Sequence, residues 1–249
     1  MKQLLLFLFL ALVLQDLSAQ TLHSREKDLP CLNGHINLHV HIALDSLQNA
    51  NFDITALESA VTTCNRYFEP ICLSFSICEI DTIYNYNFDS LGLQAELAHI
   101  TGLHQTAKRL NVYLVEDMWE PGICGFGGGR TIWLRKACPE SFTHEMGHVF
   151  GLAHTFAGNG TENVDGSNCD TAGDGICDTP ADPYNPALTD EIDYQRGCEF
   201  IFEGLDANGQ YYQPDMGNIM SYYGCDCGFT RGQYLSMAEV YLNSHKNLW

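Results

Sequence analysis

The stretch HEMGHVFGLAH, residues 144–154, is the most informative part of this sequence, because its three histidines are spaced so that they can bind one metal ion. His144 and His148 are four residues apart, so on a helix both imidazoles project from the same face. Gly151 permits the turn that ends the helix and returns His154 toward the other two rings. Three neutral imidazoles with one open position form a ligand set of catalytic zinc. We therefore expect His144, His148 and His154 to bind zinc.

Glu145 follows the first of these histidines and lies off the face that carries the ligands. Its carboxylate is placed to take a proton from water at the metal, without occupying a coordination position itself. The pattern thus predicts a hydrolase with Glu145 as general base and then general acid. A helix whose histidines are simply exposed is the alternative, and the combined spacing does not favour it.

The extended pattern HExxHxxGxxH is that of the metzincin zinc endopeptidases. The residues around it resemble the pappalysin family of that clan, which includes ulilysin-type bacterial proteases. The resemblance covers the chain well from about residue 111 to the C-terminus and only loosely before that. It rests on four stretches, HTF at 154–156, GDGICDTP at 173–180, NIMSY at 218–222 and FTRGQ at 229–233.

The resemblance implies roles for five further residues. Met220 is expected in a methionine turn below the metal, and the Tyr222 hydroxyl is expected to hydrogen-bond the developing oxyanion. Asp174 and Thr179 resemble calcium ligands, and the alternative is that their loop is only a tight turn. Asp226 matches an acidic residue at the floor of the pocket for the residue after the scissile bond, which implies a preference for Arg or Lys there. The alternative is that Asp226 faces solvent or binds a cation.

The fold implied is α+β (mixed α/β), a metzincin-like catalytic domain over residues 35–249. Its upper subdomain, about 35–154, would hold a twisted mixed sheet with the active-site helix. Its lower subdomain, about 155–249, would be irregular and disulfide-rich and would end in a C-terminal helix. The residue pattern is compatible with this, since 158–217 is dense in Gly, Asp, Asn and Pro.

Periodicity and capping residues predict the individual elements. We expect strands at 36–44, 71–83, 111–115 and 131–135, and helices at 52–67, 91–99 and 229–242, besides the helix with the histidines. The strand 131–135 resembles the clan's edge strand, to which a substrate peptide would pair. The glycine-rich stretch 122–129 before it lacks the residues of a phosphate-binding loop and is expected to be a plain turn.

The N-terminal residues have the features of a secretory signal peptide over 1–19. Lys2 precedes an apolar run at 4–14, and Leu17-Ser18-Ala19 provides a cleavage site. A membrane anchor needs about 20 apolar residues, and Gln15-Asp16 interrupts the run. We expect a secreted protein without a membrane anchor, in which a short segment, 20–34, precedes the catalytic domain.

All 11 cysteines lie beyond residue 19, and in an exported protein their default state is a disulfide framework. The odd number leaves at least one thiol unpaired or bonded to another molecule. Cys31 could in principle bind the zinc and confer latency, but a disulfide is the favoured interpretation. His39 and His41 are two residues apart, so on a strand both lie on the same face, where they are candidates for a second metal site. Such pairs more often only make hydrogen bonds.

The charge balance restricts the partners, because the chain has 12 Lys and Arg residues against 31 Asp and Glu residues and therefore a formal net charge of −19. Nucleic acid is excluded, since no basic stripe exists to neutralise phosphates. Such a field attracts basic peptides instead, and we expect peptide or protein substrates. Two other functions stay open, a non-proteolytic zinc-containing binding or toxin-like module and a zinc hydrolase with a non-peptide substrate. The sequence predicts no oligomeric state.

Overall fold

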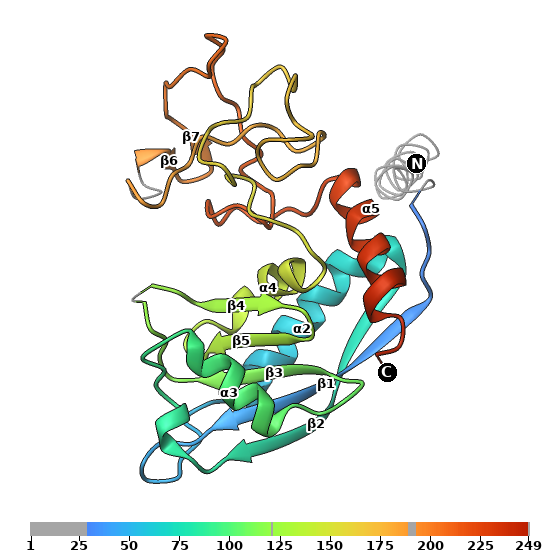
Figure 1. Cartoon of the computed structure of the whole chain (residues 1–249), viewed down its shortest axis with the longest axis vertical. Helices are drawn as coiled ribbons and strands as arrows, with labels where there is room; N and C mark the ends of the chain where they lie inside the picture. Colours follow the sequence, from blue (N-terminus) through green and yellow to red (C-terminus); the bar gives the residue numbers. More distant parts are fainter. Residues whose placement is uncertain (1–28, 121, 189–192, 249) are drawn as a thin grey trace, which may run out of the picture.

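The computed structural model describes residues 29–120, 122–188 and 193–248 (Figure 1). The expected signal peptide, 1–19, and the first part of the segment 20–34 lie outside the described residues. Among the residues that are described, no helix combines the length and apolar character that crossing a bilayer requires.

A five-stranded mixed sheet forms the lower half of the molecule in the view of Figure 1, below the loop-rich half. The strand order is β2-β1-β3-β5-β4. The pairs β1–β2, β1–β3 and β3–β5 are parallel, and β4 runs antiparallel to β5. The strands are β1 (Gly34–Ala43), β2 (Leu73–Ile83), β3 (Leu110–Val115), β4 (Gly125–Gly128) and β5 (Thr131–Arg135). The mixed α/β fold predicted from the sequence is therefore confirmed.

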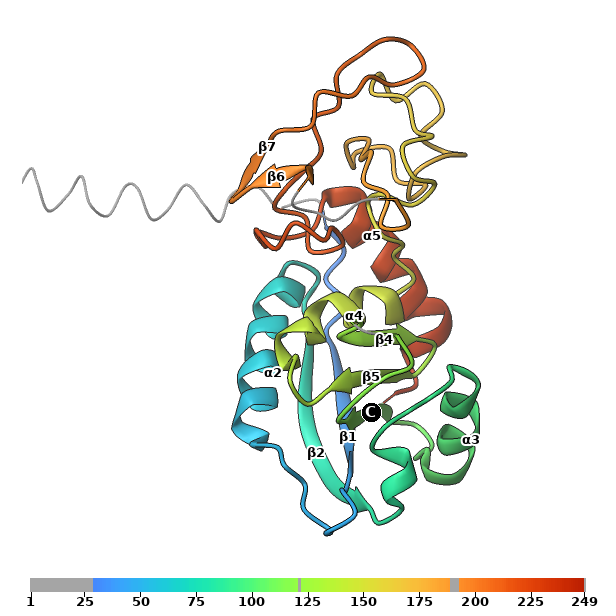
Figure 2. The same cartoon turned by 90° about the vertical axis from the view of Figure 1, so that its left-hand side faces the viewer.

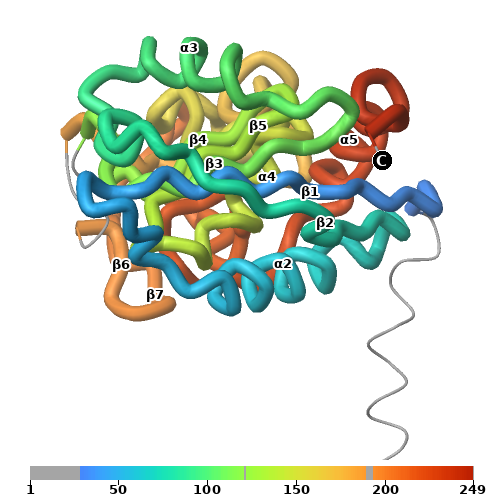
Figure 3. The backbone as a smooth tube through the Cα atoms, turned by 90° about the horizontal axis from the view of Figure 1, so that it is seen from below, coloured from blue at the N-terminus to red at the C-terminus, as the bar shows by residue number. Residues whose placement is uncertain are grey.

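Helices cover both faces of the sheet (Figures 2 and 3). The helices are α2 (Ile54–Phe68), α3 (Ala95–His104), α4 (Phe142–Val149) and α5 (Arg231–Val240), the last continued by a π-helical turn (Tyr241–His245). Helices α2 and α4 lie on one face and α3 on the other. The Asp53 side chain caps α2 by accepting a hydrogen bond from the Thr55 N–H. Thr230 and Gln233 form a capping box that fixes the start of α5.

The alternation of β1 divides its side chains between the two faces. Ile36, Leu38 and Val40 are fully buried in the main core, which α2 and α4 complete. His39 and His41 point to the opposite face, where Tyr113 stacks on the His41 ring with centroids 4.6 Å apart. A second apolar cluster on that face packs beneath α3. Each large apolar side chain buried in this way contributes roughly 1.5–3 kcal/mol.

The glycine-rich stretch corrects two of the expectations. Residues Gly125–Gly128 are not a plain turn but strand β4, and β4 rather than β5 is the edge strand next to the histidine helix. Strand β5 lies inside the sheet, between β3 and β4. A Cβ at Gly127 would overlap the backbone of Glu145 in α4. The absence of a side chain at Gly127 is thus what permits this strand to lie directly against the helix.

Four disulfides crosslink the chain, namely Cys31–Cys72, Cys124–Cys138, Cys169–Cys177 and Cys198–Cys225. Cys64, Cys78 and Cys227 are free thiols, which accounts for the odd total. Because Cys31 is bonded to Cys72, its thiol is not available to a metal. Two of the disulfides, Cys169–Cys177 and Cys198–Cys225, crosslink the loop-rich half beyond α4. Regular structure is sparse there, as predicted, and includes the short strands β6 (Gln195–Arg196) and β7 (Glu199–Phe200).

Candidate metal centre

Three histidine rings meet where α4 ends. His144 and His148 project from one side of α4, and the helix closes with an N–H···O bond from Leu152 to Gly147 of 3.0 Å. Gly151 has a φ of +84°, a left-handed conformation that favours glycine and turns the chain back. His154 Nε2 consequently lies 3.1 Å from the Nε2 atoms of both His144 and His148.

The outer nitrogens of the two helical histidines fix their tautomers. His144 Nδ1 lies 2.7 Å from the Ile219 carbonyl oxygen, and His148 Nδ1 lies 2.8 Å from that of Leu152. A carbonyl only accepts, so each Nδ1 carries the proton and each Nε2 presents a lone pair. Zinc bonds of 2.0–2.1 Å place tetrahedral ligand atoms about 3.3 Å apart. The donor set and its spacing therefore fit a zinc ion.

Burial keeps these rings neutral, as metal ligands must be. The pKa of His144 is lowered to about 4 and that of His154 to about 3, in both cases chiefly by burial and then by the neighbouring histidines. Burial also lowers the pKa of His148. The three rings are thus uncharged at neutral pH, which is the form that binds a metal.

Glu145 lies beside the histidines in a buried position, with 5% of its surface exposed. Burial raises its pKa to about 8, and a hydrogen bond with the Gly127 backbone partly offsets that rise. A cation at the histidines favours the ionised carboxylate again. The side chain is therefore suited to exchange a proton near neutral pH.

Met220, the residue expected in a methionine turn, packs against α4 at Gly147. It is fully buried, and a Cβ at Gly147 would overlap its sulfur. The turn is held from below by Asn218, whose Oδ1 accepts from the Met220 N–H at 2.9 Å. Asn218 in turn exchanges two hydrogen bonds with Gln233 of α5. The sequence assigned no role to Gly147, Asn218 or Gln233, because these residues acquire one only where α4 and α5 approach the turn that carries Met220.

Tyr222 stands over the metal centre on the side that faces the cleft. Its ring centroid lies 4.8 Å from that of His154 and 5.7 Å from that of His144. Desolvation, followed by the charge of Glu145, raises the pKa of its hydroxyl to about 12. The hydroxyl therefore stays protonated and able to donate a hydrogen bond.

A cleft runs over the three histidines and also reaches Asp226. Its walls include Phe126 of β4, Tyr67 of α2 and Tyr222. The Tyr67 hydroxyl donates to the Asp226 carbonyl oxygen at 3.4 Å. Asp226 is exposed as a residue, yet partial burial of its carboxyl group raises the pKa of that group. Asp226 thus lines the cleft and is also open to solvent, and its part in substrate preference stays a prediction.

Beside the two expected calcium ligands, Asp174 and Thr179, lies a second acidic residue, Glu162, which the sequence did not indicate. Glu162 Oε2, Asp174 Oδ2 and Thr179 Oγ1 are buried atoms that make no hydrogen bond of ordinary geometry. The pKa of Glu162 is raised to about 7 by burial and then by Asp174 and Asp182, and that of Asp174 to about 6, chiefly by burial. Buried, unsatisfied oxygens from two carboxylates and a hydroxyl fit a hard cation.

Comparisons with known proteins agree with this geometry. The family model of peptidase M43, described as pregnancy-associated plasma protein-A, matches residues 134–242. An extracellular metalloprotease of Neurospora crassa is 27% identical over 242 residues, covering 86% of this chain and 76% of its own. Another from Podospora anserina is 27% identical over 212 residues, covering 74% and 69%.

The fold also matches a solved structure, that of a mutant of Tannerella forsythia promirolysin. The TM-score is 0.62 at 16% identity, and the match covers 94% of this chain and 88% of that one. At this identity the likeness concerns the fold alone.

Proposed function

This chain is a metalloprotease of the pappalysin family, and on that premise we propose that it acts outside the cell as an endopeptidase whose zinc is held by His144, His148 and His154. The observation that carries the proposal is the convergence of three Nε2 atoms, with that of His154 lying 3.1 Å from those of both His144 and His148. The extracellular location is supported by the names of the fungal relatives and by the four disulfides.

Bound zinc supplies a Lewis acid that polarises the scissile carbonyl and makes water a better nucleophile at neutral pH. Glu145 takes the proton from the attacking water and then delivers it to the leaving amine. The Tyr222 hydroxyl donates a hydrogen bond to the oxyanion that develops on the substrate carbonyl. Met220 supports the turn whose Ile219 carbonyl orients the His144 ring, at 2.7 Å.

The substrate is a peptide in an extended conformation. We place it along the outer edge of β4, whose backbone N–H and C=O groups on that side have no partner strand among the described residues. Strand β4 adjoins Glu145, so a peptide paired there runs past the metal centre. This assignment replaces β5, which is enclosed between β3 and β4.

Asp226 confers a preference for Arg or Lys after the scissile bond. Its carboxylate lines the cleft that holds the histidines, and a guanidinium or ammonium group would meet it there. Because Asp226 is exposed, the selection is modest and depends on salt. The net charge of −19 attracts basic peptides more generally.

Calcium is the second cofactor of the proposal, bound by Glu162, Asp174 and Thr179. Three of their buried oxygens make no hydrogen bond of ordinary geometry, and the charge of Asp174 raises the pKa of Glu162, so the two carboxylates repel each other without a cation between them. The ion would hold together the loop-rich half of the domain.

Cleavage of a peptide library by the purified chain tests the proposal, with the zinc content measured on the same sample. Glu145→Gln should keep zinc and lose turnover, whereas the matched change at the exposed Glu239 of α5 should leave both unchanged. Wild-type turnover in Glu145→Gln would remove the general base from the proposal. An inactive wild type that holds its zinc would favour the non-proteolytic module, which the comparisons do not support.

A further inference from the structure

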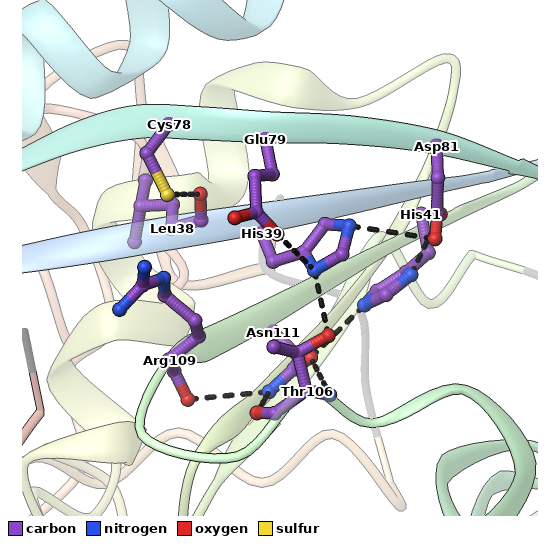
Figure 4. Close-up of polar contacts among 9 residues, drawn as sticks. All are labelled: Leu38, His39, His41, Cys78, Glu79, Asp81, Thr106, Arg109 and Asn111. Carbon is purple, nitrogen blue, oxygen red and sulfur yellow. Dashed lines mark hydrogen bonds and ion pairs between the residues drawn. The ribbon is translucent and has the colours of Figure 1, made fainter.

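A second group of histidines, whose polar contacts Figure 4 shows, lies on the face of the sheet that carries Tyr113. His39 and His41 of β1 meet Asp81 of the neighbouring strand β2. A bulge in β2 creates this meeting, because the register shifts by one residue and pairs His41 with Asp81 instead of the apolar Ile80. One ligand atom from each of the three lies within 4.8 Å of the others.

The tautomer of His41 is fixed by Asn111. The Asn111 amide nitrogen donates to the carbonyl oxygens of Thr106 and Arg109, and its oxygen accepts from the Thr106 N–H. That oxygen also lies 2.9 Å from His41 Nε2, which must therefore carry a proton. The remaining nitrogen, His41 Nδ1, faces the Asp81 carboxylate at 2.8 Å.

His39 repeats the same arrangement beside it. Its Nδ1 lies 2.7 Å from the Thr106 hydroxyl and 3.3 Å from a carboxylate oxygen of Glu79, so this outer nitrogen carries the proton. Its inner nitrogen, Nε2, faces the other Asp81 oxygen at 3.4 Å. Both imidazoles thus donate outward and turn their lone pairs toward one carboxylate, as histidine ligands with supporting partners do.

Two nitrogen lone pairs that face an ionised carboxylate repel it unless a cation lies between them. A proton on His41 Nδ1 satisfies only one of the two contacts and leaves His39 Nε2 opposite Asp81. A divalent metal satisfies both, and the mixed nitrogen and oxygen set suits zinc and its neighbours in the transition series. His41 is fully buried, whereas the Asp81 side chain is 49% exposed, which provides a path of entry.

We propose that His39 Nε2, His41 Nδ1 and the Asp81 carboxylate bind a second zinc-type ion, on the opposite face of the sheet from the metal centre of α4. Glu79 is not a ligand, because it approaches the proton-bearing nitrogen of His39. The ion ties β1 to the partly exposed strand β2 and takes no part in peptide hydrolysis.

Zinc per chain, measured by elemental analysis, tests the proposal on the full chain after dialysis against zinc chloride with calcium present. Wild type should hold one zinc more per chain than Asp81→Asn, and Glu79→Gln should hold as much as wild type. Both variants should retain proteolysis. Equal zinc in wild type and Asp81→Asn would overturn the proposal, since the cation between the rings would then be a proton. If instead the α4 centre held no zinc, the zinc contents of wild type and of Asp81→Asn would both be lower by one ion per chain, and the difference between them would remain.

Anomalous diffraction from zinc-loaded wild-type crystals provides a measurement that needs no variant. A zinc peak between His39, His41 and Asp81 is the expected result, and absence of a peak there would overturn the proposal.

Discussion

Replacing Glu162 with glutamine separates a calcium-binding role from a structural role. In the wild type, calcium should raise the melting temperature, because binding to the folded state alone stabilises it by mass action. The Glu162→Gln side chain keeps the shape and loses the charge, so it should abolish that increment. Removing the charge also removes its repulsion with Asp174, so the melting temperature without calcium should not fall.

The size of the increment follows from the affinity expected for an extracellular calcium site, a Kd of about 10⁻⁴–10⁻³ M. At 10 mM calcium the concentration exceeds Kd by about 10- to 100-fold, which stabilises the folded state by roughly 1.4–2.7 kcal/mol. For a chain of this length each kcal/mol moves Tm by roughly 2–4 °C. The expected increment is therefore roughly 3–11 °C.

The increment should also depend on pH in a direction that the pKa values fix. Without calcium, the folded-state pKa values of Glu162, about 7, and Asp174, about 6, lie above their ordinary values of 4.5 and 3.8. The folded chain then binds more protons than the unfolded chain between about pH 4 and 7, so stability falls as pH rises through this window. Calcium replaces those protons, and its stabilising effect should grow over the same window.

The assay is thermal unfolding followed by circular dichroism, on zinc-loaded protein stripped of calcium. Wild type, Glu162→Gln and, as a matched control, a glutamine at the exposed Glu203 are compared with no added metal, with calcium and with magnesium. A Glu162→Gln protein that melts lower than wild type without calcium, yet keeps the full calcium increment, would refute the reasoning.

Three further outcomes follow from the geometry around the metal centre. Tyr222→Phe should lower kcat by about 10²–10³ with the zinc content unchanged, since the lost hydroxyl acts on the transition state, and an unaltered kcat would exclude that role. Asp226→Asn should reduce the kcat/KM preference for Arg over Leu peptides by up to about fivefold, the worth of an exposed charge pair, and salt should erase the same preference in wild type. Gly147→Ala should destabilise the chain by about 1–3 kcal/mol, because its Cβ would overlap the Met220 sulfur. The open Gly128 provides the control for the same urea-unfolding measurement, and equal effects of the two alanines would contradict the close contact.

The sequence by itself determined the features that depend on residues close together along the chain. Helical geometry fixes His144 and His148 on one side of α4, and Gly151 fixes the turn that returns His154. Capping by Asp53 and the alternation of β1 are equally local, so the predicted α2 and β1 differ from the observed elements by one or two residues at each end.

Only the tertiary structure decided the features that require distant segments to meet. The glycines of β4 read locally as a turn, and they form a strand because α4 lies too close for any side chain at Gly127. Glu162 had no local signal, and its buried oxygen gains meaning only beside Asp174 and Thr179. Spacing carries no information on such contacts, because they arise from packing rather than from helical or strand periodicity.

The two histidine clusters show the same division within one molecule. In the first, all three histidines belong to an eleven-residue stretch, 144–154, so the spacing alone revealed the site. In the second, His39 and His41 gave only an ambiguous pair, and Asp81 joins them through the parallel pairing of β1 with β2 and a one-residue bulge. Strand pairing and register are set by the burial of whole sheet faces, and no short segment encodes them.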